Sequence, residues 1–149
     1  METLRVLFVC IHNSGRSQMA EAFLNYYGED KFYAESAGLE AGKLNPIVVD
    51  VIQESGIDIS ANKTKDVFDF YKAGKRFNYV ITVCDESNAE RCPIFPGTIE
   101  KLHWSFKDPA ALEGSYEEKL KGTRVIRDEI KTKIINWIEE INLKSADTE

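Results

Sequence analysis

The amino-acid sequence predicts an α/β domain built on a parallel sheet of about four strands, with helices on both faces. Two observations indicate this class. Strand-like runs alternate with segments of helical periodicity along the 149 residues, which is the order that parallel sheets require. Two of the strand-like runs, Leu4–Val9 and Tyr79–Val83, are also nearly all apolar, as expected of strands that are covered on both faces. At this length residues 1–149 are expected to form a single domain with a substantial core.

The first half of the chain predicts two strands and two helices. Leu4–Val9 is an apolar run, interrupted only by Arg5, and predicts a buried strand, and Phe32–Ser36 predicts a second, shorter one. Between them, apolar residues recur at i, i+3, i+4 and i+7, which predicts a helix that ends at Gly28. These residues are Ala20, Phe23, Leu24 and Tyr27. Asn45 followed by Pro46 predicts the capped start of a second helix.

The second half predicts two more strands, at Tyr79–Val83 and around Lys101–His103. The polar stretch from Cys84 to Cys92 fits either a short helix or a mobile loop. In such a sheet, ligands bind at the carboxyl ends of the strands, beside the point where the strand order reverses.

The last helix is predicted to be the longest. Ser115 and Glu118 have the spacing of a capping box at its start. An apolar stripe follows, formed by Ile130, Ile134, Trp137, Ile138 and Ile141. From Lys144 to residue 149 the chain is polar, and a frayed tail is expected there.

Composition excludes several classes of function. The net charge is −6, with 25 acidic against 19 basic side chains and no basic tract, which argues against nucleic acid or an anionic membrane as the main partner. No apolar run approaches the roughly 18–20 residues of a membrane span. The first residues lack the pattern of a signal peptide, so a cytoplasmic protein is expected. Three cysteines in a reducing compartment point to catalysis, redox exchange or metal binding rather than to a disulfide framework.

The segment from Cys10 to Ser17 carries the most specific chemical signal. A cysteine, five residues and an arginine, placed between a strand and a helix, predict a loop that holds a tetrahedral oxyanion against a thiolate. Arg16 can grip two oxygens of such an ion, and the same positive field favours the thiolate form of Cys10. The backbone amides expected to bind the oxyanion belong to Ile11, His12, Asn13, Ser14 and Gly15.

Each part of this motif also has an ordinary structural interpretation. A cysteine that ends a buried strand is most often a small core residue, an arginine early in a helix is most often solvated, and Ser17 could serve only as a helix cap. A bare C-x5-R pattern also arises by chance. The strand before it, the helix after it and Gly15 within it favour the functional interpretation.

Two further features follow predicted strand ends, so that they could meet Cys10 in space. Asp108-Pro109 could supply a carboxyl group that gives a proton to a leaving oxygen, although Asp-Pro also initiates turns. Cys84 and Cys92 could complete a relay in which the second thiol attacks the first and the third resolves the disulfide. The alternatives are inert burial of Cys84 or a zinc site, whose usual ligand spacing this pair lacks.

At these residues the chain resembles the thioredoxin-coupled arsenate reductases, which share a fold with low-molecular-weight tyrosine phosphatases. The resemblance covers about residues 5–138. It rests on the segments 10–21, Ser36-Ala37-Gly38, Gly56-Ile57-Asp58-Ile59-Ser60, Thr82-Val83-Cys84, Cys92-Pro93, His103-Trp104 and Asp108-Pro109-Ala110.

The resemblance implies that Cys10 attacks arsenate, which loses water with help from Asp108. Cys84 then attacks Cys10 and releases arsenite, and Cys92 takes over Cys84 to give a Cys84–Cys92 disulfide that thioredoxin reduces. Ser17 would stabilise the Cys10 thiolate. The family also suggests a monomer and, in some members, a potassium ion near the loop. No tightly bound cofactor is expected, and the candidates for that potassium site are Asn13, Glu21 and Ser36.

Two departures from the family pattern are visible. Gly15 stands where some relatives have an additional cysteine, and seven residues, 85–91, separate Cys84 from Cys92 where six are common. Two other functions stay open at this point. The chain could be a phosphatase that acts on phosphomonoesters through a phosphocysteine at Cys10, or a non-catalytic redox or oxyanion sensor.

Overall fold

The structure, a computed structural model, describes residues 3–84 and 86–147. Four strands form one sheet in the order β2-β1-β3-β4, and each neighbouring pair is parallel. The strands are β1 Leu4–Cys10, β2 Phe32–Gly38, β3 Tyr79–Thr82 and β4 Glu100–His103. The predicted four-stranded parallel sheet is therefore confirmed.

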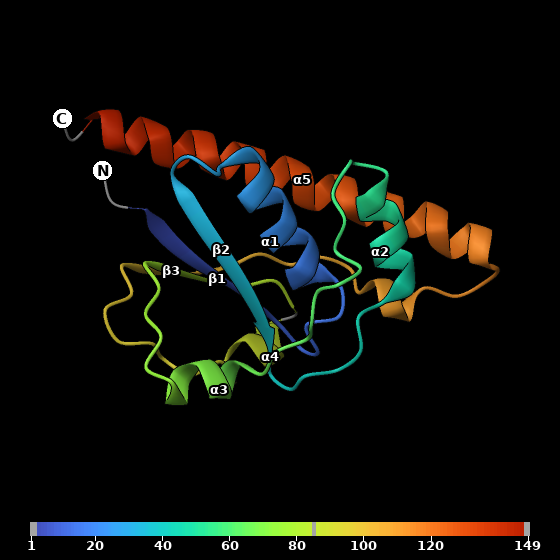
Figure 1. The fold of residues 1–149 in the computed structure, drawn as a ribbon, viewed down its shortest axis with the longest axis horizontal. Coiled ribbons are helices and arrows are strands. Elements are labelled where there is room, and N and C mark those ends of the chain that lie inside the picture. Colours follow the sequence, from blue (N-terminus) through green and yellow to red (C-terminus); the bar gives the residue numbers. More distant parts are fainter. Residues whose placement is uncertain (1–2, 85, 148–149) are drawn as a thin grey trace.

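Helices cover both faces of the sheet (Figure 1). On one face lie α1 Arg16–Tyr27, α2 Pro46–Gln53 and the long α5 Tyr116–Asp147. On the other lie the short helices α3 Val67–Lys72 and α4 Glu86–Ala89. A 3-10 turn, η1, spans Pro109–Ala111.

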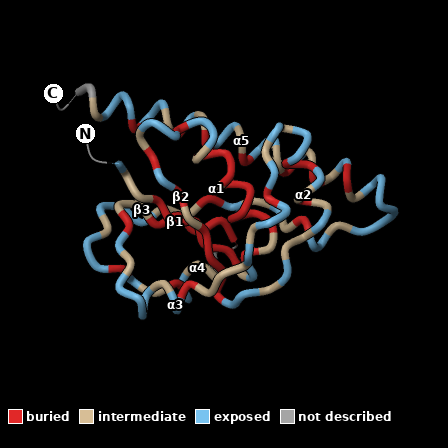
Figure 2. The backbone as a smooth tube through the Cα atoms, viewed as in Figure 1, coloured by how far each residue is buried: buried red, intermediate tan, exposed pale blue. Residues whose placement is uncertain are grey.

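The core has two parts because side chains alternate across the strands. Val6, Phe8 and Cys10 of β1 face α1, α2 and α5, and they belong to the larger cluster of buried residues. Leu7 and Val9 face the other way and pack in a smaller cluster. Figure 2 shows that burial is concentrated in the central strand and in α1. The continuous apolar sequence of β1 from Val6 onward follows from this burial on both sides.

The registers bring the carboxyl ends of the strands together. Cys10 pairs with Gly38 of β2, Val9 with Thr82 of β3, and Thr82 with His103 of β4. The chain places β2 on one side of β1 and then crosses over to place β3 on the other side. The strand order therefore reverses at β1. The loop after Cys10 thus leaves the sheet at the switch point where ligands bind in open α/β folds.

Several local predictions are confirmed. Asn45 caps α2 by accepting a hydrogen bond from the Ile47 amide at 2.9 Å, with Pro46 as the first helical residue. The capping box forms at the start of α5, where the Glu118 amide donates to Ser115 Oγ at 3.2 Å. The stretch after Cys84 takes the helical alternative, as α4, while Asp85 lies outside the described residues.

The structure continues α5 to Asp147, and the frayed tail expected from Lys144 stays a prediction. Lys31, in the turn before β2, donates from Nζ to Asn142 Oδ1 at 2.9 Å and to Ser145 Oγ at 3.0 Å. These contacts tie the last turns of the helix to the body of the protein. Residues 148–149 lie outside the described chain.

Candidate active site

The loop between β1 and α1 turns its carbonyl groups outward. The carbonyls of Cys10, Ile11, His12 and Ser14 accept hydrogen bonds from the amides of Leu39, Glu40, Gly42 and Asn45, at 2.9 to 3.0 Å. In a trans peptide the N–H points opposite to the C=O. The amides that follow these carbonyls therefore point to the inner side of the loop, where the Cys10 sulfur lies. The Asn13 amide donates to Cys10 Sγ at 3.2 Å.

Gly38 lets the loop approach the end of β2. A Cβ atom at this position would lie 2.7 Å from the Asn13 nitrogen and 2.7 Å from the His12 carbonyl carbon. Any side chain here would push the loop off the sheet. Gly15 is less constrained, since a Cβ there would meet Val48 at 3.4 Å.

Cys10 is a reduced, buried thiol that ends β1, and Ser17 lies on the first turn of α1. The Cys10 sulfur is 2.8 Å from Ser17 Oγ. A hydroxyl and an amide both directed at one sulfur stabilise a thiolate more than a thiol. The positive end of α1 acts in the same direction.

Asn13 holds this arrangement in place. Its backbone has φ 57°, in the left-handed region that asparagine tolerates better than most residues. Its side-chain nitrogen donates to Ser17 Oγ at 2.8 Å. Its side-chain oxygen accepts from Gln18 Nε2 at 3.1 Å and from the Lys65 amide at 3.0 Å. The orientation of Ser17 toward Cys10 therefore depends on Asn13.

Arg16 and Asp108 meet beside the loop. The Arg16 guanidinium is buried, donates to the Phe106 carbonyl at 3.2 Å and lies 3.7 Å from Asp108 Oδ2. Asp108 also accepts from the Ala110 amide at 2.9 Å and caps η1. The Asp-Pro pair thus initiates a turn and also presents a carboxylate to the arginine of the loop.

The other two thiols lie on different sides of the sheet. Cys84, just after β3, is buried in the same cluster as Cys10. Cys92, after α4, is 5% exposed and packs in the smaller cluster on the opposite face. Burial raises the pKa of the Cys92 thiol to about 11, with the neighbouring Cys84 acting in the same direction. Cys92 is therefore a protonated core residue in this state.

The three potassium candidates are close together. Ser36 Oγ donates to Glu21 Oε1 at 3.0 Å. The same carboxylate oxygen lies 3.7 Å from Lys65 Nζ. Burial raises the pKa of the Glu21 carboxyl, and Lys65 and Ser36 oppose that shift. Asn13 reaches this group through the Lys65 amide.

Neither histidine joins a metal site. His12 Nδ1 is half-exposed and lies 3.1 Å from Glu40 Oε1. His103 packs at the end of β4, with Nδ1 2.7 Å from Thr82 Oγ1. Within residues 3–84 and 86–147, no group of three or more His, Cys, Asp or Glu side chains could hold a metal ion, so the zinc alternative has no support there.

Sequence reasoning missed four residues that shape the loop. Gln18 donates to the carbonyls of Asn13 and Lys63, at 3.1 and 3.2 Å, and Asn62 donates to Gln18 Oε1 at 3.0 Å. Lys65 binds Asn13 from its main chain. The signal available was weak, because the segment that holds residues 62–65 reads only as polar and irregular.

Comparisons with known proteins agree with this geometry. The sequence model of the low molecular weight phosphotyrosine protein phosphatase family matches residues 5–147. An arsenate reductase of Bacillus subtilis (strain 168) is 40% identical over 139 residues, which cover 93% of this chain and 98% of that one.

Among the helices that the structure describes, none has the length and apolarity needed to cross a membrane.

Solved structures give the same result. An arsenate reductase in its phosphate-binding state superposes with a TM-score of 0.76 at 29% identity, covering 93% of this chain and 99% of that one. A thioredoxin-dependent arsenate reductase of Corynebacterium glutamicum gives a TM-score of 0.68 at 31% identity. That match covers 97% of this chain and 64% of the other.

Proposed function

The chain belongs to the low molecular weight phosphotyrosine protein phosphatase family, and we propose that it uses the oxyanion loop of that family to reduce arsenate to arsenite. The observation that carries this proposal is the placement of Cys84, a second reduced thiol buried in the same cluster as Cys10. A phosphatase needs only water after its covalent intermediate has formed. A reductase must also supply two electrons, and a second thiol that can reach the first supplies them.

In the first step, the loop amides and Arg16 hold arsenate and the Cys10 thiolate attacks arsenic. A sulfur–arsenic bond forms, and one arsenate oxygen leaves as water. Asp108, which lies 3.7 Å from Arg16, is placed at the loop and provides a proton to that oxygen. Ser17 Oγ, 2.8 Å from Cys10 Sγ, is in position to donate a hydrogen bond to the attacking thiolate.

In the second step, the Cys84 thiolate attacks the Cys10 sulfur. The sulfur–arsenic bond breaks and its electron pair stays on arsenic, so that arsenic(V) becomes arsenic(III). Cys10 and Cys84 are oxidised to a disulfide, and arsenite leaves. Burial of both thiols in one cluster supports this pairing.

In the third step, Cys92 attacks Cys84, and Cys10 leaves as a thiolate ready for another arsenate. The product is a Cys84–Cys92 disulfide, which a dithiol protein of the thioredoxin class reduces. Cys92 is buried on the opposite face of the sheet, with a raised pKa. The segment around α4 must therefore rearrange before this attack, and α4 is only four residues long.

The proposed partners follow from this sequence of steps. They are arsenate or a similar tetrahedral oxyanion and thioredoxin, with no tightly bound cofactor. The homologous arsenate reductases, one of them thioredoxin-dependent, support both partners. We propose a cytoplasmic protein, since the relay ends on a partner that reduces disulfides, and a monomer, as the family resemblance implies.

Steady-state turnover tests the proposal. The protein is supplied with arsenate, thioredoxin, thioredoxin reductase and NADPH, and arsenite is quantified. We expect turnover by the wild type, none by Cys10→Ser, and one arsenite per molecule followed by arrest for Cys92→Ser. Unchanged turnover by Cys10→Ser would contradict the role of the nucleophile, and repeated turnover by Cys92→Ser would remove Cys92 from the relay.

A parallel assay addresses the phosphatase alternative. Hydrolysis of a phosphomonoester by the wild type, without release of arsenite from arsenate, would assign the loop to phosphatase chemistry. The shared oxyanion site allows some hydrolysis alongside reduction, so the arsenite yield decides between the two.

A further inference from the structure

We propose that the ammonium group of Lys65 is a built-in cation for the oxyanion loop, so that this chain does not take the potassium ion that some members of its family hold there. The inference concerns the oxyanion site of the proposed function. The candidate ligands for such a potassium ion in this chain are Asn13, Glu21 and Ser36.

The candidate oxygens are already engaged. Hard cations bind several oxygen ligands at once. An amide oxygen has two lone pairs, and those of Asn13 Oδ1 accept from Gln18 Nε2 and the Lys65 amide, at 3.1 and 3.0 Å. Ser36 Oγ is directed at Glu21 Oε1 as a donor, at 3.0 Å. These residues as arranged do not fit a potassium site.

The ammonium group of Lys65 already lies beside the Glu21 carboxylate. Lys65 Nζ lies 3.7 Å from Glu21 Oε1, the oxygen that also accepts from Ser36. The Glu21 side chain is 15% exposed and that of Lys65 is 32% exposed. A carboxylate buried to this extent needs a compensating charge, and Lys65 provides it.

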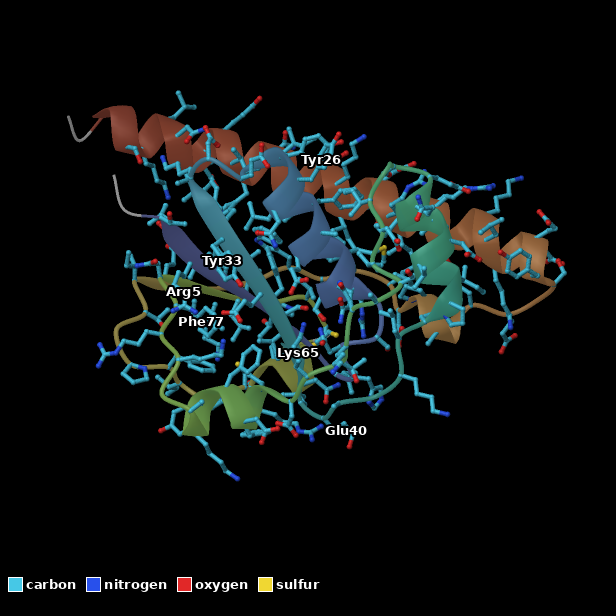
Figure 3. All side chains as sticks on the ribbon, viewed as in Figure 1. Arg5, Tyr26, Tyr33, Glu40, Lys65 and Phe77 are labelled. Atoms are coloured by element: carbon cyan, nitrogen blue, oxygen red, sulfur yellow. The ribbon has the colours of Figure 1, made fainter. Side chains whose placement is uncertain are left out.

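The backbone of Lys65 fixes the start of its side chain. Its amide donates to Asn13 Oδ1 and its carbonyl accepts from the Gly38 amide at 2.8 Å. The next residue, Asp66, forms an isolated parallel bridge with Gly38. The segment therefore lies against the end of β2, and Figure 3 shows Lys65 near that end.

These contacts connect Lys65 to the reacting sulfur. Asn13, which Lys65 holds, donates to Ser17 Oγ at 2.8 Å, and Ser17 Oγ lies 2.8 Å from Cys10 Sγ. Removing the ammonium leaves Glu21 as an uncompensated negative charge beside a loop that must bind an anion. Lys65 is thus a positioning residue, and its loss weakens oxyanion binding.

The test compares potassium with sodium at equal ionic strength, using inorganic phosphate as a non-reducible probe of the reduced protein. Phosphate affinity is measured by titration calorimetry and the melting temperature by circular dichroism. The variants are Lys65→Met, Lys65→Arg and the control Lys75→Met. Lys75 makes a similarly buried pair with Glu35, at 2.8 Å, with side chains 34% and 16% exposed, and Arg5 also lies 2.9 Å from that carboxylate.

We expect the wild type and Lys65→Arg to bind phosphate equally in both salts. Lys65→Met should lose about tenfold in phosphate affinity in sodium and in potassium alike, because the Glu21 charge is left uncompensated while Asn13 Oδ1 and Ser36 Oγ stay engaged. Lys75→Met should bind phosphate as the wild type does. The melting temperature of Lys65→Met should fall below that of the wild type by the same amount in both salts.

A wild type that is stabilised by potassium over sodium would overturn the inference, and that comparison needs no variant. So would a Lys65→Met protein whose phosphate affinity is normal, or is restored by potassium but not by sodium. The melting temperatures test the Lys65 pair without any oxyanion. A wild type that fails to bind phosphate would therefore count against the proposed function, while the salt comparison would still decide the role of Lys65.

Discussion

Ser17 shows how one side chain of the loop acts through another. Its hydroxyl is 2.8 Å from Cys10 Sγ and accepts from Asn13 Nδ2 at 2.8 Å. Because Asn13 supplies the donor, the Ser17 hydroxyl hydrogen is left to face the sulfur. The ordinary interpretation of Ser17 as a helix cap is wrong, since the helix has Gly15 at its N-cap position and no side-chain cap.

Removal of this hydroxyl gives a prediction at the residue scale. Ser17→Ala should lower kcat/KM for arsenate by roughly 10- to 100-fold, because a hydrogen bond to a charged group contributes about 1.5–3 kcal/mol. The measurement is arsenite production at limiting arsenate. Ser60→Ala, at an exposed serine, is the control and should leave turnover unchanged. A Ser17→Ala rate within twofold of the wild type would show that the thiolate does not depend on this contact.

The segment that carries α4 and Cys92 is the element whose state changes most in the proposed mechanism. Its cysteine lies in the cluster formed with Leu7, Phe77 and Phe95 on the face opposite Cys10. At neutral pH the buried thiol is protonated, because burial raises its pKa to about 11. The packing that protects Cys92 from premature reaction also requires the segment to move before Cys92 can attack.

This burial predicts an alkaline loss of stability. Well below pH 9 the thiol is neutral in both states and contributes nothing to the pH dependence. Between pH 9 and 11 the unfolded chain releases the proton while the folded protein keeps it, so the free energy of unfolding falls as pH rises. The loss attributable to Cys92 approaches about 2–3 kcal/mol.

Urea denaturation of the reduced protein at pH 8 and pH 10.5 measures this effect, with Cys92→Ala as the reference. Other groups titrate in both proteins and cancel in the comparison. The wild type should lose more stability than Cys92→Ala across this interval. Equal losses would mean that Cys92 is not held protonated in the folded core.

At the scale of the whole molecule, the fold could be predicted from the parts of the sequence with regular apolar patterns or local capping residues. The apolar run of β1 predicted a strand buried on both faces, and the registers place Cys10 at the switch point as expected. Asn45 and the Ser115–Glu118 box predicted helix starts because capping depends on local residues. The order of the strands then follows from general rules of parallel sheets.

The unpredicted parts depend on contacts between segments without periodicity. The end of α5 contacts Lys31, which binds Asn142 and Ser145 from more than a hundred residues away. The segment around Lys65 reaches the loop through main-chain groups, whose direction no side-chain pattern reveals. The opposite burial of Cys84 and Cys92 likewise depends on where α4 packs. The C-x5-R motif identified the loop, whereas the residues that support it became visible only in the fold.

The most direct test of the central claim is a single-turnover experiment. Fully reduced protein is mixed with arsenate in the absence of reductant, the remaining thiols are trapped, and the disulfide is located by peptide mapping. The account predicts one arsenite released per molecule, with Cys84 and Cys92 joined and Cys10 free. Three intact thiols and no arsenite, together with hydrolysis of a phosphomonoester in a parallel sample, would contradict it.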